Sequence, residues 1–136
     1  MNKAEMLAKL RGGITDEQWE ALAEGRLKVS AFNRAVLLEL RETEARGPGV
    51  VDEAKTIGLR KVTEDYLRRY LPEAPEAWQW IITASLYLTF IAERPMHPID
   101  MLHITVMRDE GRMVYECPAK SNDPNTTCHY CVCKGK

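Results

Sequence analysis

Apolar residues recur at three- and four-residue intervals through most of the chain, which is the spacing of one face of an α-helix. The pattern predicts a first short helix over residues 2–11. A second helix is expected after the capping box formed by Thr15 and Gln18. Ser30 is the expected cap of a third helix that runs to about Ala45. The first third of the chain is therefore predicted to be helical.

Two longer helices are expected after the strong break at Gly47-Pro48-Gly49. One runs from about Glu76 to Glu93, and its residues 77–92 carry no charged side chain. A membrane-spanning helix needs about 20 apolar residues, so this shorter run is expected at the centre of a soluble core. The other runs from about Val51 to Leu71, with an apolar side predicted to consist of Ala54, Ile57, Val62, Tyr66, Leu67 and Tyr70.

The pattern changes after Pro95, where helical spacing gives way to short apolar runs. Residues 104–107 and 113–116 flank Asp109-Glu110-Gly111, which is a hairpin turn signal. The predicted fold is mostly α, with about five helices, a small C-terminal β-hairpin and a zinc knuckle. The core of the helices is expected to bury Trp19, Phe32, Leu37, Tyr66, Trp80, Ile82, Tyr87 and Phe90.

The length of 136 residues corresponds to a single domain. We expect a helical body over residues 1–95 and a metal-binding hairpin and knuckle subdomain over residues 96–136. Hydrophobic residues make up 45% and charged residues 29%, which excludes wholesale disorder. The net charge of -1 excludes a strongly basic nucleic-acid coat protein. The opening residues lack the apolar core of a secretory signal, so a cytoplasmic protein with no membrane association is expected.

All four cysteines and all three histidines follow Pro95. Thiols clustered in this way in a reducing compartment more often hold a metal than form disulfides. Cys128 and Cys131 form a Cys-x-x-Cys pair, whose tight turn lets both sulfurs face one metal ion. Cys117, at the end of the second predicted strand, is the natural third ligand.

The residues alone leave the fourth ligand open. His97 lies between Met96 and Pro98, in a stiff segment that would tie the metal to the helices. Cys133 is the rival, although it is only two residues from Cys131. An iron–sulfur cluster held by the four cysteines is an alternative, as are disulfides or free thiols.

Sequence signatures of an enzyme are absent: there is no Gly-rich phosphate loop, no Gly-x-Ser-x-Gly and no His-Glu-x-x-His. No catalytic residue is therefore assigned, and carboxylates such as Glu64 and Asp65 are expected to be solvated. Nucleic-acid binding has weak support from two groups of cations. These are Arg60, Lys61, Arg68 and Arg69 on the fourth helix and Lys120, Lys134 and Lys136 near the cysteines.

Three segments in the last third of the chain resemble an uncharacterised family of small proteins from methanogenic archaea, known as domain of unknown function 2115. These segments are residues 94–98 (RPMHP), 115–120 (YECPAK) and 125–131 (NTTCHYC). The resemblance implies one histidine and three cysteines as metal ligands and treats Cys133 as extra. The implied ligands are His97, Cys117, Cys128 and Cys131.

Together these features predict a zinc-binding helical protein of unknown function. A site with four protein ligands has no open position for substrate, so the zinc is expected to be structural. The favoured function is a non-enzymatic interaction or assembly factor with a protein partner. The alternatives are a nucleic-acid-binding zinc-knuckle protein and an iron–sulfur or redox metalloprotein.

Overall fold

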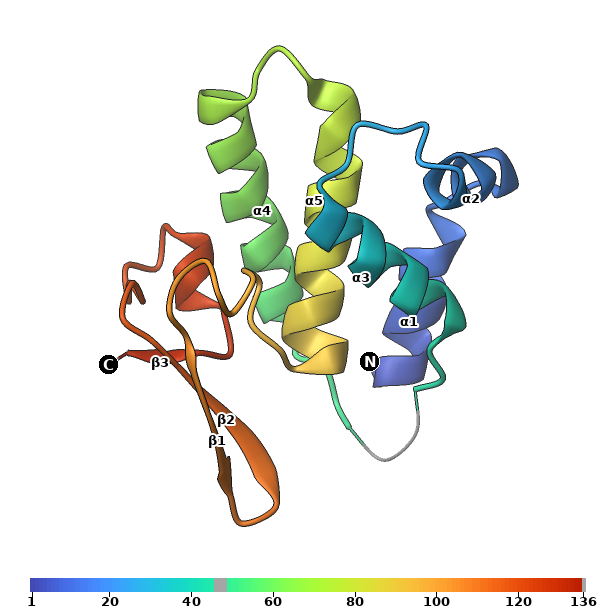
Figure 1. The fold of residues 1–136 in the computed structure, drawn as a ribbon. Coiled ribbons are helices and arrows are strands. Elements are labelled where there is room, and N and C mark those ends of the chain that lie inside the picture. Colours follow the sequence, from blue (N-terminus) through green and yellow to red (C-terminus); the bar gives the residue numbers. More distant parts are fainter. Residues whose placement is uncertain (46–48, 136) are drawn as a thin grey trace.

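The computed structural model describes residues 1–45 and 49–135, which form five α-helices followed by a small three-stranded sheet (Figure 1). The predicted mostly-α fold with a C-terminal β element is therefore confirmed. The expected break at Gly47-Pro48-Gly49 falls mainly outside the described residues. The helices are α1 (Lys3–Gly12), α2 (Asp16–Ala23), α3 (Ala31–Glu42), α4 (Glu53–Tyr70) and α5 (Trp78–Tyr87), and the strands are β1 (Thr105–Asp109), β2 (Arg112–Cys117) and β3 (Lys134–Gly135).

Side-chain caps determine where the first helices begin. Thr15 Oγ1 accepts a hydrogen bond from the Gln18 amide at 3.1 Å, and Gln18 Oε1 accepts one from the Thr15 amide at 2.9 Å. Two of the amides left unpaired at the start of α2 are thereby satisfied, as the predicted capping box requires. Ser30 Oγ accepts from the Asn33 amide at 3.1 Å and caps α3 in the same way.

Helix α3 ends at Glu42, earlier than the expected end at Ala45. The next residue, Thr43, adopts an extended conformation. Its hydroxyl lies 2.8 Å from the Glu39 carbonyl oxygen and 2.9 Å from the hydroxyl of Tyr87 on α5. The helix ends because Thr43 is extended, and the Thr43 hydroxyl joins the last turn of α3 to α5.

Helix α4 buries a different face from the one predicted. Its buried side chains are Leu59, Thr63 and Leu67, which repeat every four residues. The Thr63 hydroxyl is accommodated because it donates to the Leu59 carbonyl at 2.7 Å. Several residues of the predicted apolar side are exposed instead, which corrects the prediction for α4 and removes Tyr66 from the expected core. These are Ala54, Ile57 (68% exposed), Tyr66 (56%) and Tyr70 (62%).

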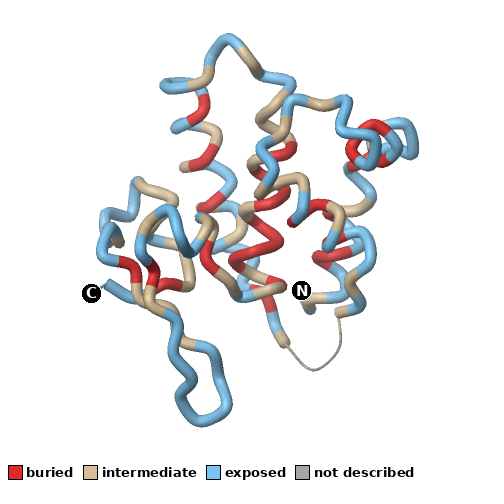
Figure 2. Tube along the Cα trace, viewed as in Figure 1, coloured by how far each residue is buried: buried red, intermediate tan, exposed pale blue. Residues whose placement is uncertain are grey.

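The helix expected from Glu76 to Glu93 consists of three consecutive parts. A 3₁₀ turn (Pro75–Ala77) leads into α5, and a π-helical turn (Leu88–Ala92) follows it. Glu93, in the left-handed conformation with φ of 54°, ends the segment. Helices α1, α3 and α4 all contact α5, so this apolar segment lies at the centre as predicted (Figures 1 and 2).

Residues 96–135 form what we call the C-terminal lobe. Strands β1 and β2 pair as the predicted hairpin, with Asp109 opposite Arg112. Glu110 and Gly111 form its turn and both have positive φ, of 49° and 80°. A two-residue turn of this kind matches the right-handed twist of the strands. Figure 1 shows the hairpin extending away from the helices.

A third strand, which the sequence pattern did not predict, closes the lobe. β3 pairs with β2 in parallel, with Glu116 opposite Lys134 and Cys117 opposite Gly135. The chain after Cys131 therefore returns to the strand that ends in Cys117. The lobe also contacts α4, because the Tyr130 ring packs directly over the Gly58 backbone.

Candidate functional site

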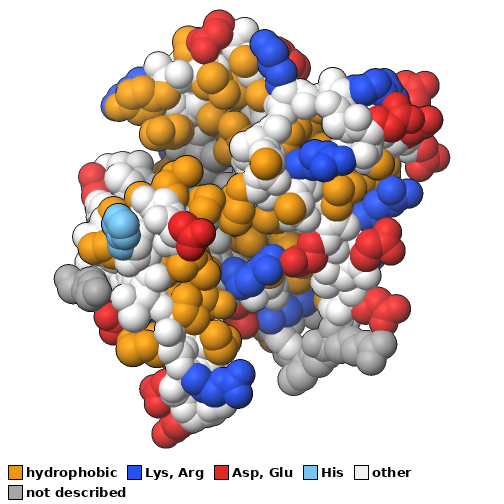
Figure 3. Space-filling model, in the orientation of Figure 1, with side chains coloured by type: hydrophobic (Ala, Val, Ile, Leu, Met, Phe, Trp, Pro, Cys, Tyr) orange, Lys and Arg blue, Asp and Glu red, His pale blue; other side chains and the backbone are white. Residues whose placement is uncertain are grey.

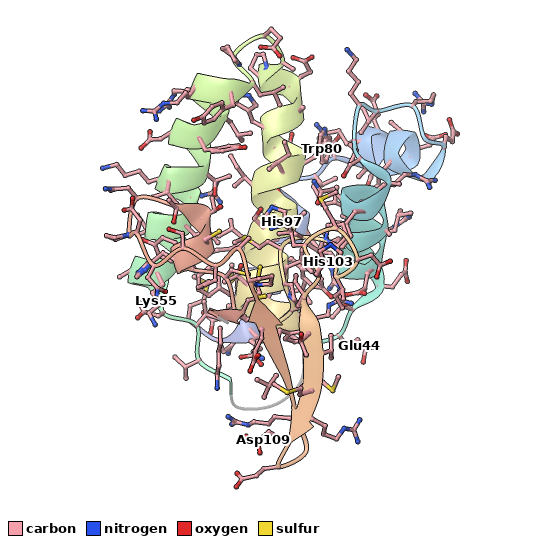
Figure 4. All side chains as sticks on the ribbon, turned by 60° about the vertical axis from the view of Figure 1, so that its left-hand side comes forward. Glu44, Lys55, Trp80, His97, His103 and Asp109 are labelled. Atoms are coloured by element: carbon pink, nitrogen blue, oxygen red, sulfur yellow. The ribbon has the colours of Figure 1, made fainter. Side chains whose placement is uncertain are left out.

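The four residues predicted as metal ligands come from separate segments, and they line one small cavity of about 20 Å³ at the base of the hairpin. Cys133 lines the same cavity. Figure 4 shows His97 in front of α5, with sulfur atoms gathered between it and the start of the hairpin. We call this space the thiol cavity. Its lining residues are Pro95, Met96, His97, Leu102, Ile104, Cys117, Ala119, Lys120, Cys128, Cys131 and Cys133.

The backbone positions the cysteines. Cys117 is the last residue of β2 and is buried, as the sequence predicted for the end of the second strand. Cys128 lies in a short 3₁₀ turn (Thr127–His129), and the Cys131 amide donates to the Cys128 carbonyl at 3.2 Å. This bond holds the two cysteines of the Cys-x-x-Cys pair on one tight turn.

Lys120 fastens that turn to the rest of the lobe. Its ammonium group donates to the Cys131 carbonyl oxygen at 2.8 Å and also to that of Cys128. The lysine therefore ties the start of the loop after β2 to the Cys-x-x-Cys turn. A lysine used in this way has fewer donors left for a phosphate, which weakens the basic surface considered for nucleic acid.

Cys133, the rival for the fourth ligand position, lies beside Cys131 and Cys117. The pKa of the Cys133 thiol is raised to about 12, mainly by burial and also by the neighbouring Cys131 and Cys117. Cys131 is also hydrogen-bonded to it. The parallel pairing of β3 explains this position, because Cys133 immediately precedes Lys134, which is paired with β2.

His97 lies at the edge of the thiol cavity rather than inside it. Part of its ring is exposed to solvent, yet the surrounding protein desolvates the imidazole and lowers the pKa of His97 below its usual value. A neutral imidazole is the form that binds a metal ion. His97 also borders two larger cavities, one towards α3 and one towards α4.

The donor set suits a soft or borderline metal, but the side chains are not arranged around one. Among residues 1–45 and 49–135, no three His, Cys, Asp or Glu side chains converge as metal ligands do. All four cysteines are free thiols. The structure thus brings one imidazole and four sulfurs to the wall of a single cavity, and those are the donor types that zinc prefers.

Other groups considered from the sequence lie elsewhere. Glu64 and Asp65 are on the surface of α4, where both pair with Arg68, at 3.7 Å and 3.3 Å. They therefore form ion pairs on the surface of α4, where the sequence predicts a solvated helix face. Lys136 lies outside the described residues. Within the part of the chain that is described, no helix has the length and hydrophobicity required to cross a bilayer.

Comparison with known proteins gives a family and no activity. The sequence profile of DUF2115, described as an uncharacterized protein conserved in archaea, matches residues 16–136. The chain belongs to this family. No curated protein and no solved structure matches it significantly. Membership in DUF2115 agrees with the resemblance seen in the last third of the sequence and extends it over α2 to α5.

Proposed function

We propose that the C-terminal lobe binds one structural zinc ion through His97, Cys117, Cys128 and Cys131. The observation that carries the proposal is the thiol cavity of about 20 Å³, which these four side chains line together. One water molecule needs roughly 10–15 Å³ of such space, so the cavity suits a single ion and no larger ligand. Thiolate sulfur and imidazole nitrogen are the donors that zinc prefers.

In this proposal the protein is a single domain with two parts, a helical body of residues 1–95 and a metal-dependent part of residues 96–136. The lobe has little apolar core of its own, because Ile104, Cys117 and Cys133 make up its small buried cluster. Structural zinc contributes about 10–16 kcal/mol in small finger peptides. A whole domain has about 5–15 kcal/mol of stability, so the ion can decide whether the lobe folds.

The role that follows is a non-enzymatic interaction or assembly factor with a protein partner. Four protein ligands leave zinc no open position, and the thiol cavity has no room for a substrate. The ion would hold the hairpin and the Cys-x-x-Cys turn in a fixed orientation on α4. We place the protein in the cytoplasm, because four free thiols at one cavity suit a reducing compartment.

An iron–sulfur cluster is the second candidate, and the position of Cys133 favours it. Four cysteine sulfurs line the thiol cavity, and such clusters are commonly held by four cysteines. Against it, a cluster of several atoms needs more room than a single ion. The two candidates differ in colour, because iron–sulfur proteins are brown and zinc proteins are colourless.

Elemental analysis of protein purified without oxygen tests the proposal. We expect one zinc per chain and a colourless solution. Chelation of the metal should disorder the residues after Pro95 while most of the helical circular dichroism remains. Protein without bound metal, or a brown solution with iron, would refute the zinc site. Loss of all helical signal on chelation would contradict the two-part organisation.

Metal release from single variants identifies the fourth ligand. We expect His97→Ala to release zinc to a chromophoric chelator as readily as Cys128→Ser, because each removes one ligand. Cys133→Ser should retain zinc and serves as the matched cysteine control. The opposite ranking of His97→Ala and Cys133→Ser would assign the fourth position to Cys133.

A further inference from the structure

A second, larger cavity lies beside the thiol cavity. It has a volume of about 500 Å³ and runs between α3, α4 and α5 on one side and the C-terminal lobe on the other. Figure 3 shows a hollow in this region with hydrophobic side chains on both of its sides. We call it the uncharged groove. Its lining residues are Ser30, Phe32, Asn33, Thr63, Tyr66, Ile81, Ser85, Met96, His97, Pro98, Met101, Thr127 and Cys128.

None of these lining residues is Lys, Arg, Asp or Glu, although such residues make up 29% of the chain. Four other cavities formed by the described residues each include at least one charged side chain. Examples are Glu39 and Arg94 in the cavity near α3, and Arg112 and Lys134 in the cavity near the hairpin. The lining of the groove therefore offers a charged ligand no carboxylate, ammonium or guanidinium group.

The walls include aromatic and thioether side chains, which are those of Phe32, Tyr66, Met96 and Met101. Tyr66 is 56% exposed and Met101 is 65% exposed, and they belong to opposite sides of the groove. The Tyr66 ring lies against Tyr70, with centroids 4.7 Å apart, which restricts its motion. Sulfur–aromatic contacts and ring stacking favour a flat aromatic ligand between such walls.

Neutral hydrogen-bonding groups complete the lining. The Asn33 amide group and the Ser85 hydroxyl form no side-chain hydrogen bond within residues 1–45 and 49–135. Both can therefore bond to a ligand without breaking an existing contact. A lining in which apolar surface predominates over neutral polar groups is typical of small-molecule sites, which usually occupy about 300–1,000 Å³.

We propose that the uncharged groove is a binding site for a neutral aromatic small molecule, in which the ligand lies between Tyr66 and Met101. The volume of the groove suits a small molecule, and the absence of Lys, Arg, Asp and Glu from its lining favours a neutral ligand. Phe32 and Tyr66 select an aromatic ring system. This site is separate from the proposed zinc site, although His97 and Cys128 border both cavities.

Two fluorescent probes with the same ring system test the ligand class. N-phenyl-1-naphthylamine is neutral, whereas 1-anilinonaphthalene-8-sulfonate has the same rings and one negatively charged sulfonate group. We expect the neutral probe to bind with increased fluorescence and the sulfonate to bind about tenfold more weakly or not at all, because its charge would be unpaired in the groove. Equal or tighter binding of the sulfonate would overturn the proposal.

Two methionine variants locate the probe. Met101→Lys places a charge on the wall of the groove and should weaken binding of the neutral probe about tenfold. Met107→Lys is the matched control, since Met107 is also an exposed methionine of the lobe but lies on β1 outside the groove. Circular dichroism should show both variants folded. If the two variants weaken binding of the neutral probe equally, or if neither weakens it, the proposed site is wrong.

Filling the groove gives an independent test from the helical side. Ser85→Phe adds a ring at a half-exposed position of α5 and should exclude the probe. Retained probe binding in Ser85→Phe would place the probe elsewhere. Zinc content is measured on the same samples, so that zinc without probe binding refutes this inference alone. Probe binding without zinc refutes the proposed metal site alone.

Discussion

Replacing Gly58 by alanine tests how the C-terminal lobe is docked on α4. Gly58 lies inside the helix, where alanine is more favourable than glycine by about 1 kcal/mol. A Cβ at this position would lie 2.9 Å from Cζ and 3.2 Å from Cε1 of Tyr130, and it would overlap the Tyr130 hydroxyl. The ring must therefore move away from the helix before the new methyl group fits.

The two effects have opposite signs, and their sizes can be compared. Forcing an extra methyl group into a packed contact costs about 1–3 kcal/mol. After the gain of about 1 kcal/mol in helix propensity, Gly58→Ala should destabilise the protein by about 0–2 kcal/mol. In a Tyr130→Ala background the obstruction is gone, and the same substitution should stabilise the protein by about 1 kcal/mol. The expected coupling between the two positions is therefore about 1–3 kcal/mol.

Urea unfolding followed by circular dichroism measures the four variants of this cycle. Gly12→Ala is the control, because no atom lies within 4 Å of a Cβ built there. Its effect should be the same with Tyr130 and with alanine at position 130. Equal stabilisation by Gly58→Ala in both backgrounds would show that the lobe does not pack on α4 through Tyr130.

Three further predictions concern the body and the thiol cavity. Leu59→Ala should cost about 2–5 kcal/mol, whereas Ile57→Ala should change stability by less than about 0.5 kcal/mol. Tyr87→Phe should cost about 1–3 kcal/mol, because the Tyr87 hydroxyl donates to the Glu39 carboxylate at 2.6 Å. Lys120→Met should weaken zinc binding about tenfold while the helical signal is kept, because it frees two carbonyls of the Cys-x-x-Cys turn.

The Tyr87 prediction includes a pH dependence. Burial and then the hydrogen bond to Glu39 raise the pKa of Tyr87 above its usual value of 10.0. The protonated phenol is thus favoured in the folded state. Its contribution to the free energy of unfolding is complete below about pH 10 and is lost as the pH rises further. Wild-type protein should lose more stability than Tyr87→Phe between pH 9 and 11, as measured by urea unfolding. Parallel losses would contradict the assignment.

The predictions for α4 and for Lys120 also have controls. Equal costs of Leu59→Ala and Ile57→Ala in urea unfolding would mean that the buried face of α4 is wrong. Lys120→Arg keeps a cationic donor and should retain most of the zinc affinity in competition with a chelator. An unchanged affinity in Lys120→Met would remove the lysine from the support of the site.

The features that could be predicted from sequence depend on short-range signals. The caps at Thr15 and Ser30 and the hairpin turn at Glu110-Gly111 each involve residues within a few positions of one another. Cys117 could be placed at the end of β2 for the same reason, since the turn fixes the length of the hairpin. Local backbone preferences and local hydrogen bonds are sufficient in all of these cases.

The features that were missed depend on contacts between distant segments. Tyr66 is apolar enough for a core, but the buried face of α4 is decided by Leu59 and by Thr63, whose polarity is satisfied inside the helix. β3 is only two residues long, and its pairing with β2 has no local signal. The return of the chain along β2, which brings Cys133 to the thiol cavity, likewise has no local signal, so the sequence leaves His97 and Cys133 as rivals for the fourth position.

The direction in which the chain leaves the π-helical turn (Leu88–Ala92) depends on the number of residues in that turn. Each residue of an α-helix turns the chain by about 100°, so deleting one residue here would rotate everything after it by about that angle. The Arg94 amide bonds to the Leu88 carbonyl at 2.8 Å, which sets the exit towards His97. Among DUF2115 proteins, we therefore expect substitutions along this turn to be more frequent than insertions or deletions.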